Sequence, residues 1–222
     1  MTPPTEPPAK RLSFGLLLLI SFVLFNGAYV IDQMFRWSDP LQGLTNGLIH
    51  IFFNGITWLL IILPWSLVIR ALYRRRKWRR FRSQWVLAPS LLVMALTFAN
   101  LVFSPPTPKN RFRSFAHTEL PENVGQLHYR FTGGGIADFG DTYYFQTTPA
   151  EVDRLITEMA LEEDIFFTEG KEDYSSVPTL PDCPNHQLWP DAKLYQRSEN
   201  GWFYYLLHNA EKTEVYVFIA CI

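Results

Sequence analysis

Residues 70–82 read Arg-Ala-Leu-Tyr-Arg-Arg-Arg-Lys-Trp-Arg-Arg-Phe-Arg, and this basic run decides how the whole chain is organised. Around it lie three stretches without Asp, Glu, Lys or Arg, of 20, 30 and 26 residues: 12–31, 40–69 and 83–108. A helix rises about 1.5 Å per residue, so about 20 apolar residues cross a hydrocarbon core of roughly 30 Å. The pattern predicts three transmembrane helices joined in part by a basic loop, with spans at about 12–31, 46–69 and 85–103.

The distribution of charge divides the chain into two parts. Residues 1–103 carry a net charge of +8, whereas residues 104–222 carry a net charge of −9. A difference of this size indicates two different environments. We therefore expect a disordered tail, a membrane region, a Pro-rich linker and a folded soluble domain, at residues 1–11, 12–103, 104–122 and 123–222.

The basic loop also predicts the orientation in the membrane. Lys and Arg in short loops stay preferentially on the cytoplasmic side. The loop holds eight basic residues and no acid: Arg70, Arg74, Arg75, Arg76, Lys77, Arg79, Arg80 and Arg82. The sequence thus predicts a cytoplasmic amino terminus and an extracytoplasmic carboxy-terminal domain, in a cell membrane such as a bacterial inner membrane. Lys109, Arg111 and Arg113 favour the opposite orientation. Because the 70–82 loop holds eight basic residues against these three, its effect on orientation is expected to dominate.

Two alternatives concern this membrane region. The first apolar stretch is longer than the 7–15 residues of a signal-peptide core and lacks an A-x-A site, so we expect it to remain as an anchor. The basic loop, with Tyr73, Trp78 and Phe81 between its cations, is also compatible with nucleic-acid stacking. A loop of 13 residues held at both ends offers little surface for a duplex, so the expected partner is the lipid bilayer and not nucleic acid.

Polar and small residues recur along one side of the second span, at spacings of three and four: Gly43, Asn46, Gly47, His50 and Asn54. Small residues permit close helix approach, and amides hydrogen-bond across helices where lipid offers no partner. We interpret them as a helix-packing stripe, with Asn26 and Asn100 as possible partners. The alternatives are a polar pathway with His50 as its protonatable group, and a contact between copies of the chain.

The second part of the chain predicts a small α+β domain. Alternating or aromatic runs indicate an antiparallel sheet of about five strands, at 126–132, 142–147, 193–197, 202–208 and 214–221. Thr148-Pro149-Ala150-Glu151 is a capping-box pattern that begins an amphipathic helix to about Glu162. Asn200-Gly201 predicts a type I′ hairpin turn. The acidic segment 162–188 is expected to be a long loop.

The two cysteines of the chain, Cys183 and Cys221, both lie in this domain. Outside the cytosol such a pair tends to oxidise, so we predict a disulfide. Free thiols and a metal site are the alternatives. Cys183-Pro-Asn-His186 resembles half of a zinc motif, with Cys221, His117, His128 and His208 as further ligands, but the second closely spaced pair is missing.

No motif in the chain predicts an enzyme or a cofactor. Gly133-Gly134-Gly135 is followed by no helix and no Gly-Lys-Ser/Thr, which favours a hairpin turn over a phosphate loop. Asp138 and Asp141 are interpreted as solvated turn residues rather than a catalytic pair. The expected function is that of a non-enzymatic envelope protein whose outer domain binds a protein partner or joins a membrane assembly. The alternatives are a ligand sensor that signals through a partner, and an envelope hydrolase.

Overall fold

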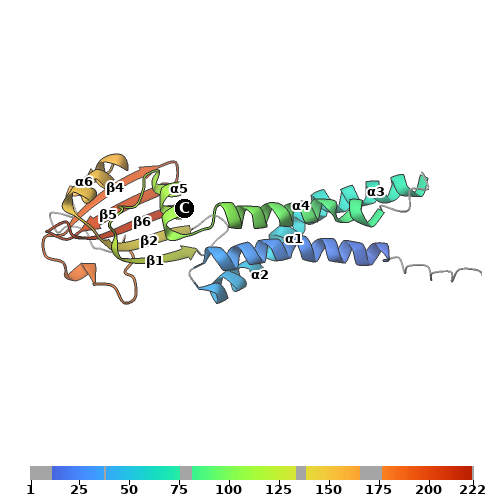
Figure 1. Ribbon diagram of the computed structural model, residues 1–222, viewed down its shortest axis with the longest axis horizontal. Coiled ribbons are helices and arrows are strands. Elements are labelled where there is room, and N and C mark those ends of the chain that lie inside the picture. The colour runs from blue at the N-terminus through green and yellow to red at the C-terminus, as the bar shows by residue number, and fades with distance from the viewer. Residues whose placement is uncertain (1–11, 38, 76–81, 134–138, 166–176, 222) are drawn as a thin grey trace, which may run out of the picture. The chain divides into compact units, whose positions relative to one another are not determined.

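The computed structural model describes residues 12–37, 39–75, 82–133, 139–165 and 177–221. The chain divides into two compact units. The first unit comprises residues 1–35 and 39–104 and is helical, whereas the second comprises residues 36–38 and 105–222 and is built around a sheet (Figure 1).

Five helical segments form the first unit: α1 (Phe14–Arg36), α2 (Pro40–Thr57), the π-helical η1 (Trp58–Ile62), α3 (Leu63–Arg75) and α4 (Arg82–Phe103). Because α2, η1 and α3 run on without a break, three helices are long and apolar enough to cross a membrane: Phe14–Arg36, Pro40–Arg74 and Arg82–Phe103. The second helix begins earlier than the span predicted at 46–69. Asp39 caps it by accepting a 2.9 Å hydrogen bond from Leu41 N, and Pro40 occupies the first turn, so the cap sets its start.

Two prolines lie inside these helices. Pro64 follows η1 directly, where Leu63 N donates to the carbonyl of Trp58, five residues earlier. Proline lacks an N–H and its ring clashes with the carbonyl four residues before it, and a wider π-helical turn relieves that clash. Pro89 lies inside α4, because that helix begins at Arg82, three residues before the predicted start of the third span at 85.

The second unit contains a six-stranded antiparallel sheet, with strand order β1-β2-β6-β5-β4-β3. Its elements are α5 (Pro108–Ala116), β1 (Gly125–Gly133), β2 (Phe139–Gln146), α6 (Pro149–Glu158), β3 (Glu162–Glu163), the 3₁₀ turn η3 (His186–Leu188), β4 (Lys193–Glu199), β5 (Trp202–His208) and β6 (Glu214–Cys221). The sequence predicts only five strands. The sixth, β3, has two residues, too short for any alternation to be seen in the sequence.

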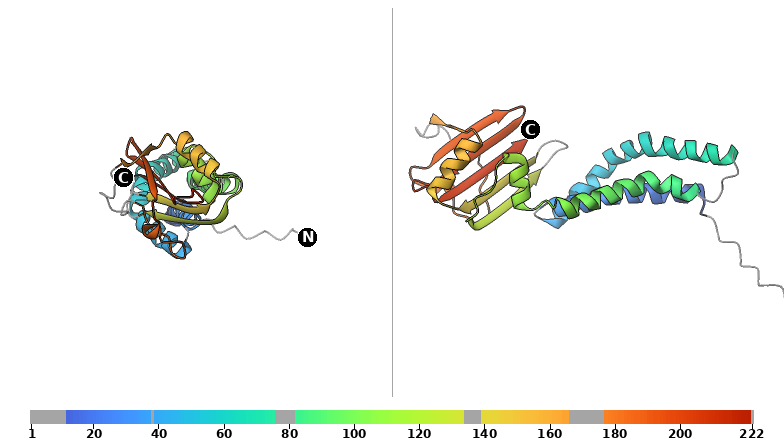
Figure 2. Two further views of the ribbon diagram at one scale, coloured as in Figure 1. Left: turned by 90° about the vertical axis from the view of Figure 1, so that its left-hand side faces the viewer. Right: turned by 45° about the horizontal axis from the view of Figure 1, so that its top comes forward.

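Each face of this sheet is covered by a different part of the chain. Successive side chains of a strand point to opposite faces. On one face, Tyr143, Val217 and Leu206 pack against residues of α5 and α6, and both helices lie on this face in Figure 2. On the other face, Tyr144 and Tyr216 pack with residues of the segment that precedes β4, such as Val177 and Leu180.

The segment predicted as a linker, 104–122, contains α5 and belongs to the core of the sheet domain. Thr107 caps α5 by accepting a 3.3 Å hydrogen bond from Asn110 N, and Pro108 occupies its first turn. Phe112 and Ala116, one turn apart, are almost fully buried. Of the prolines in this segment, Pro108 marks the start of a helix.

Two local signals of the domain can be compared with the structure. Helix α6 ends at Glu158 rather than near Glu162, because Ala160 takes a left-handed φ of 51°. Thr148 is the N-cap residue of α6 but makes no side-chain capping hydrogen bond. At the β4–β5 turn, Asn200 and Gly201 have φ of 52° and 81°, which are the two positive values that a type I′ turn requires.

Candidate functional site

A buried ion pair joins α5 to the sheet. The side chains of Arg111 and Asp141 are 7% and 1% exposed. Arg111 Nε donates to Asp141 Oδ1 at 3.0 Å, and Arg111 Nη2 donates to Oδ2 at 2.9 Å. Tyr129 of β1 donates its hydroxyl to Asp141 Oδ1 at 2.8 Å, so three elements meet at one carboxylate. We call Arg111, Asp141 and Tyr129 the buried triad.

Aromatic rings enclose the buried triad. The Arg111 guanidinium carbon lies 4.5 Å from the ring centre of Phe131 and 5.1 Å from that of Phe115. Burial raises the pKa of Asp141, while the Arg111 charge and the hydrogen bonds to the carboxylate oppose the rise. Burial and the neighbouring Asp141 carboxylate also raise the pKa of the Tyr129 hydroxyl. The ion pair is therefore held in a dry, apolar environment.

The geometry of the buried triad suits a structural clamp. Both oxygens of Asp141 already accept hydrogen bonds, and the side chain is withdrawn from solvent. A general acid or base must reach the proton that it transfers. A buried bidentate Arg–carboxylate pair instead fixes the relative position of the two elements that carry it.

Asp141 was interpreted from the sequence as a solvated turn residue, and this is wrong. It lies inside β2, because the strand begins at Phe139 rather than near Thr142. The signal that could have located it is its parity with Tyr143 and Phe145, which face the same core. Gly134, Gly135 and Asp138, the rest of the predicted turn region, lie outside the described residues.

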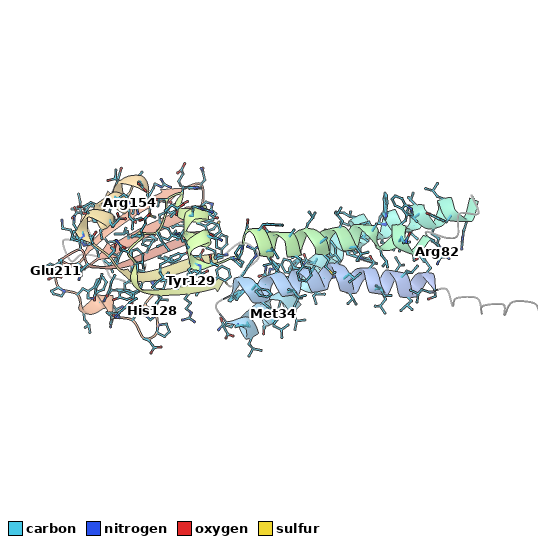
Figure 3. All side chains as sticks on the ribbon, in the orientation of Figure 1. Met34, Arg82, His128, Tyr129, Arg154 and Glu211 are labelled. Carbon is cyan, nitrogen blue, oxygen red and sulfur yellow. The ribbon has the colours of Figure 1, made fainter. Side chains whose placement is uncertain are left out.

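Strand β1 forms one edge of the sheet and pairs only with β2 among the described strands. His128 and Arg130 are exposed on the sheet face opposite to the one that α5 and α6 cover. On the helix-covered face, Leu127 is 40% exposed, whereas Tyr129 is half-buried. The strand is bulged between Gly125 and His128, where Gln126 has a φ of 46°. Phe131 of this strand is buried, and its ring packs edge-on against Trp37 with 4.9 Å between the ring centres. The exposed part of the β1 edge is therefore residues 125–128 and Arg130, and Figure 3 labels His128 on it.

The disulfide predicted between Cys183 and Cys221 is absent, and both residues are free cysteines. Cys183 packs against the sheet face that holds Tyr216. Cys221 has the same parity on β6 as Val217 and Ile219, which belong to the opposite face. The sheet therefore separates the two thiols. The disulfide prediction used only the number of cysteines and their expected compartment, neither of which shows on which face of the sheet each cysteine lies.

We expect both cysteines to alkylate in the unfolded protein without any reductant. In the folded protein Cys183 should react slowly, because burial raises the pKa of its thiol and little thiolate is present at neutral pH. Mass spectrometry after iodoacetamide treatment, with and without dithiothreitol, measures both. If the mass increase that corresponds to two alkylated cysteines appeared only after reduction, the assignment of both cysteines as free thiols would be contradicted.

The metal alternative gains no support from the described residues, among which no three His, Cys, Asp or Glu side chains are grouped to hold an ion. His186 is buried on the Tyr216 face, and its Nε2 lies 3.0 Å from the carbonyl oxygen of Val177. His208 is buried at the end of β5. His128 and His117 are exposed on other elements.

His208 predicts an acid sensitivity of the sheet domain. Burial lowers the pKa of its imidazole, as do Lys212 and Lys193, while the Asn209 carbonyl opposes the shift. A lowered folded pKa means that protonation favours unfolding, so stability is complete above the unfolded pKa of about 6.5 and falls as pH drops below it. His208→Phe should reduce this dependence by at most ~1.4 kcal/mol per pH unit. Urea unfolding between pH 7.5 and 5 measures the effect, and an unchanged pH profile would contradict it.

In the helical unit, two residues of the basic loop converge on α1. The guanidinium carbon of Arg70 lies 4.6 Å from the ring centre of Phe14, and that of Arg82 lies 5.6 Å from it. Arg74 is exposed. Arg76, Lys77, Arg79 and Arg80 lie outside the described residues, and the side chain of Arg75 is likewise not described. The start of α1 and both ends of the basic loop therefore lie at the same end of the unit.

The predicted helix-packing stripe lies against α1. A Cβ on Gly43 would come within 2.7 Å of the Gln33 carbonyl oxygen, and one on Gly47 within 3.0 Å of Val30 Cα. Asn46 Nδ2 donates to Gln33 Oε1 at 2.9 Å. The remaining polar members bond differently from the expectation. His50 Nδ1 lies 2.9 Å from the Asn46 carbonyl oxygen of its own helix, and Asn26, expected as a partner of the stripe, donates to the carbonyl of Phe22 in its own helix.

Gly43→Ala should push α2 away from α1, because the new methyl group would meet main-chain atoms that cannot move independently. Overpacking of this kind costs about 1–3 kcal/mol. Gly55→Ala is the matched control, since its Cβ would meet only the ring of Phe22 at 3.6 Å. Thermal unfolding of the detergent-solubilised full chain compares the two, and equal melting temperatures would refute close packing at Gly43.

Sequence reasoning missed a second polar contact inside the helical unit. Ser21 Oγ of α1 lies 2.7 Å from Ser90 Oγ of α4, and Trp58 Nε1 donates to Ser21 Oγ at 3.2 Å. All three side chains are buried. Isolated serines in an apolar run carry no periodic signal, although small hydroxyl residues commonly mark helix contacts in membranes.

Comparison with protein-family models, with curated proteins and with solved structures gives no match to this chain.

Proposed function

We propose that this is an integral membrane protein whose extracytoplasmic sheet domain binds a partner protein by adding one of the partner's strands to β1. Three long apolar helices support the membrane anchoring, and the excess of Lys and Arg in the 70–82 loop supports a cytoplasmic position for that loop. The amino terminus of α1 shares an end of the helical unit with the loop, as the proposed topology requires.

The edge position of β1 is the observation that carries the binding proposal. At an edge, every second residue directs its N–H and C=O away from the neighbouring strand, so the main chain is a template for another strand. In strand addition these main-chain bonds supply affinity, and alternate side chains supply specificity. The other edge is the two-residue β3, which offers far less main chain for pairing.

The side chains of β1 indicate the chemistry of the added strand. Arg130 is exposed and gives this edge a positive charge, while Leu127 beside the bulge offers apolar surface. An extended segment that alternates acidic and apolar residues complements both features. Self-pairing in the register centred on Arg130 is disfavoured, because it places Arg130 opposite Arg130 of the second copy. Like charges directly opposite destabilise a strand pair.

A photo-crosslinking amino acid at His128 tests the proposal in the full chain, in native membranes. We expect an adduct with another protein that Arg130→Glu abolishes and that an excess of a synthetic acidic–apolar peptide competes away. The control probe is Ser198, an exposed residue of β4. The control charge reversal is Lys109→Glu, on an exposed residue of α5.

Three outcomes would overturn strand addition at β1. One is an adduct between two copies of this chain, which would make β1 a homo-oligomer contact. Another is equal crosslinking from His128 and Ser198, which would indicate no preferred edge. The third is an adduct insensitive to Arg130→Glu, which would remove the electrostatic basis for an acidic partner.

The topology is tested separately by reporter fusion. A reporter that is active only outside the cytosol should work when fused after Ile222 and fail when inserted at Arg76. The opposite result would invert the protein and place the sheet domain in the cytoplasm.

A further inference from the structure

Two guanidinium groups converge on one aromatic ring at one end of the helical unit. Arg70 lies in the second half of α3, Arg82 is the first residue of α4, and both lie over the ring of Phe14 at the start of α1. The two guanidinium carbons are therefore about 10 Å apart at most. Figure 3 labels Arg82 at this end of the unit. We call Arg70, Arg82 and Phe14 the paired-arginine site.

The described part of the helical unit offers these two cations no acidic partner. Its acids are Asp32 and Asp39, both near the opposite end of α1. Asp32 is 18 residues after Phe14, or about 27 Å along a helix. That separation exceeds the Debye length of about 8–10 Å. The positive charges are thus compensated by nothing in the described unit except the Phe14 ring.

The helices themselves add positive potential at the same place. Both α1 and α4 begin here, at Phe14 and Arg82, and a helix amino terminus carries a partial positive charge with unsatisfied N–H groups. Ser13 caps α1 by accepting a 3.2 Å hydrogen bond from Leu16 N. Two arginines and two helix amino termini favour an anion at this end of the unit, and they outnumber the one helix carboxyl terminus there, that of α3 at Arg75.

We propose that the paired-arginine site binds the phosphate of an anionic phospholipid headgroup. Guanidinium groups bond phosphate oxygens in a bidentate manner over about 2.7–2.9 Å, and two of them that lie against the same ring can reach a phosphate at the edge of that ring. The exposed Trp85 near the start of α4 suits the depth at which headgroups lie. This inference rests on the membrane anchoring proposed above but not on strand addition at β1.

Native mass spectrometry of the full chain in detergent tests the site, with phosphatidylglycerol and phosphatidylcholine as probes. We expect one phosphatidylglycerol to be retained per chain in preference to phosphatidylcholine. Arg82→Gln should lower phosphatidylglycerol affinity at least about tenfold. Arg74→Gln is the matched control, because it removes the same charge from an exposed position of α3 and should cost at most about fivefold, as expected for surface charge alone.

Phe14→Leu keeps both charges but removes the ring that holds the guanidinium groups, so it should also weaken retention of phosphatidylglycerol more than Arg74→Gln does. Equal losses for Arg82→Gln and Arg74→Gln would overturn the site in favour of diffuse attraction. Equal retention of both lipids would overturn it as well. Inorganic phosphate at millimolar concentration should not displace the lipid, and full displacement would identify a free-anion site instead.

The outcomes also separate this proposal from the one on which it rests. A chain that is extracted from membranes by alkaline carbonate, without detergent, would contradict the anchoring itself. A chain that stays in the membrane but shows no lipid preference would contradict only the paired-arginine site.

Discussion

Arg111→Met should destabilise the sheet domain by about 3–5 kcal/mol, because it leaves the Asp141 carboxylate buried without its counter-charge. Asp141→Leu should lower the free energy of unfolding by a similar amount, because it leaves the Arg111 guanidinium buried without its counter-charge. The double variant Arg111→Met/Asp141→Leu should recover much of this loss, since two apolar side chains of comparable size need no compensation. Urea unfolding of the detergent-solubilised full chain, followed by hydrogen exchange of β2 and β6, measures all three.

The control for this cycle is Arg113→Met, on the same helix. Arg113 pairs with Glu119 at 3.4 Å, with side chains 62% and 55% exposed. An exposed pair contributes only about 0–1 kcal/mol. If Arg111→Met cost no more than Arg113→Met, or if the double variant were as unstable as the two single variants combined, the buried triad would not be a clamp.

Removal of α5 should have an even larger effect on the sheet domain. A fragment that begins at His117 loses both Arg111 and the fully buried Phe112. Loss of a buried Phe costs about 3–5 kcal/mol, and a broken buried ion pair costs a similar amount. Together they approach the 5–15 kcal/mol that stabilises a whole domain. We therefore expect the fragment 117–222 to lose cooperative folding.

A fragment that begins at Pro105 is the matched comparison, because it retains α5 together with Thr107, which caps it. This fragment should give a sigmoidal thermal transition by circular dichroism, whereas the shorter one should give a broad or absent transition. A cooperative transition for residues 117–222 at nearly the same temperature would show that α5 is dispensable.

Local and periodic signals allowed much of the fold to be predicted from the sequence. The three apolar helices follow from runs of uncharged residues, which are visible without knowledge of any neighbour. Strands β5 and β6 occupy the predicted residues 202–208 and 214–221, because alternation and turn residues are encoded within a few positions. The Asn200-Gly201 turn is likewise decided by the backbone conformations that these two residues tolerate.

The candidate sites depended instead on which distant segments meet. Arg111 and Asp141 are 30 residues apart, and neither has a sequence neighbour that marks it as one half of a pair. Cys183 and Cys221 looked like partners because of their number and setting, yet the sheet separates them. The guanidinium groups of Arg70 and Arg82 share a ring that lies more than 50 residues earlier in the chain.

The sequence by itself determined the apolar helices, most of the strands and the positive loop, since each depends on the period or composition of one continuous segment. Only the tertiary structure decided that residues 108–116 form a core helix, that Asp141 is buried, that the cysteines are separated and that β1 is an edge. The physical reason is that burial and pairing are properties of the face a residue presents and of the segment that covers that face. The segment that covers a face is not encoded in the residue's own neighbourhood along the chain, although parity with apolar neighbours, as for Asp141, indicates the face itself.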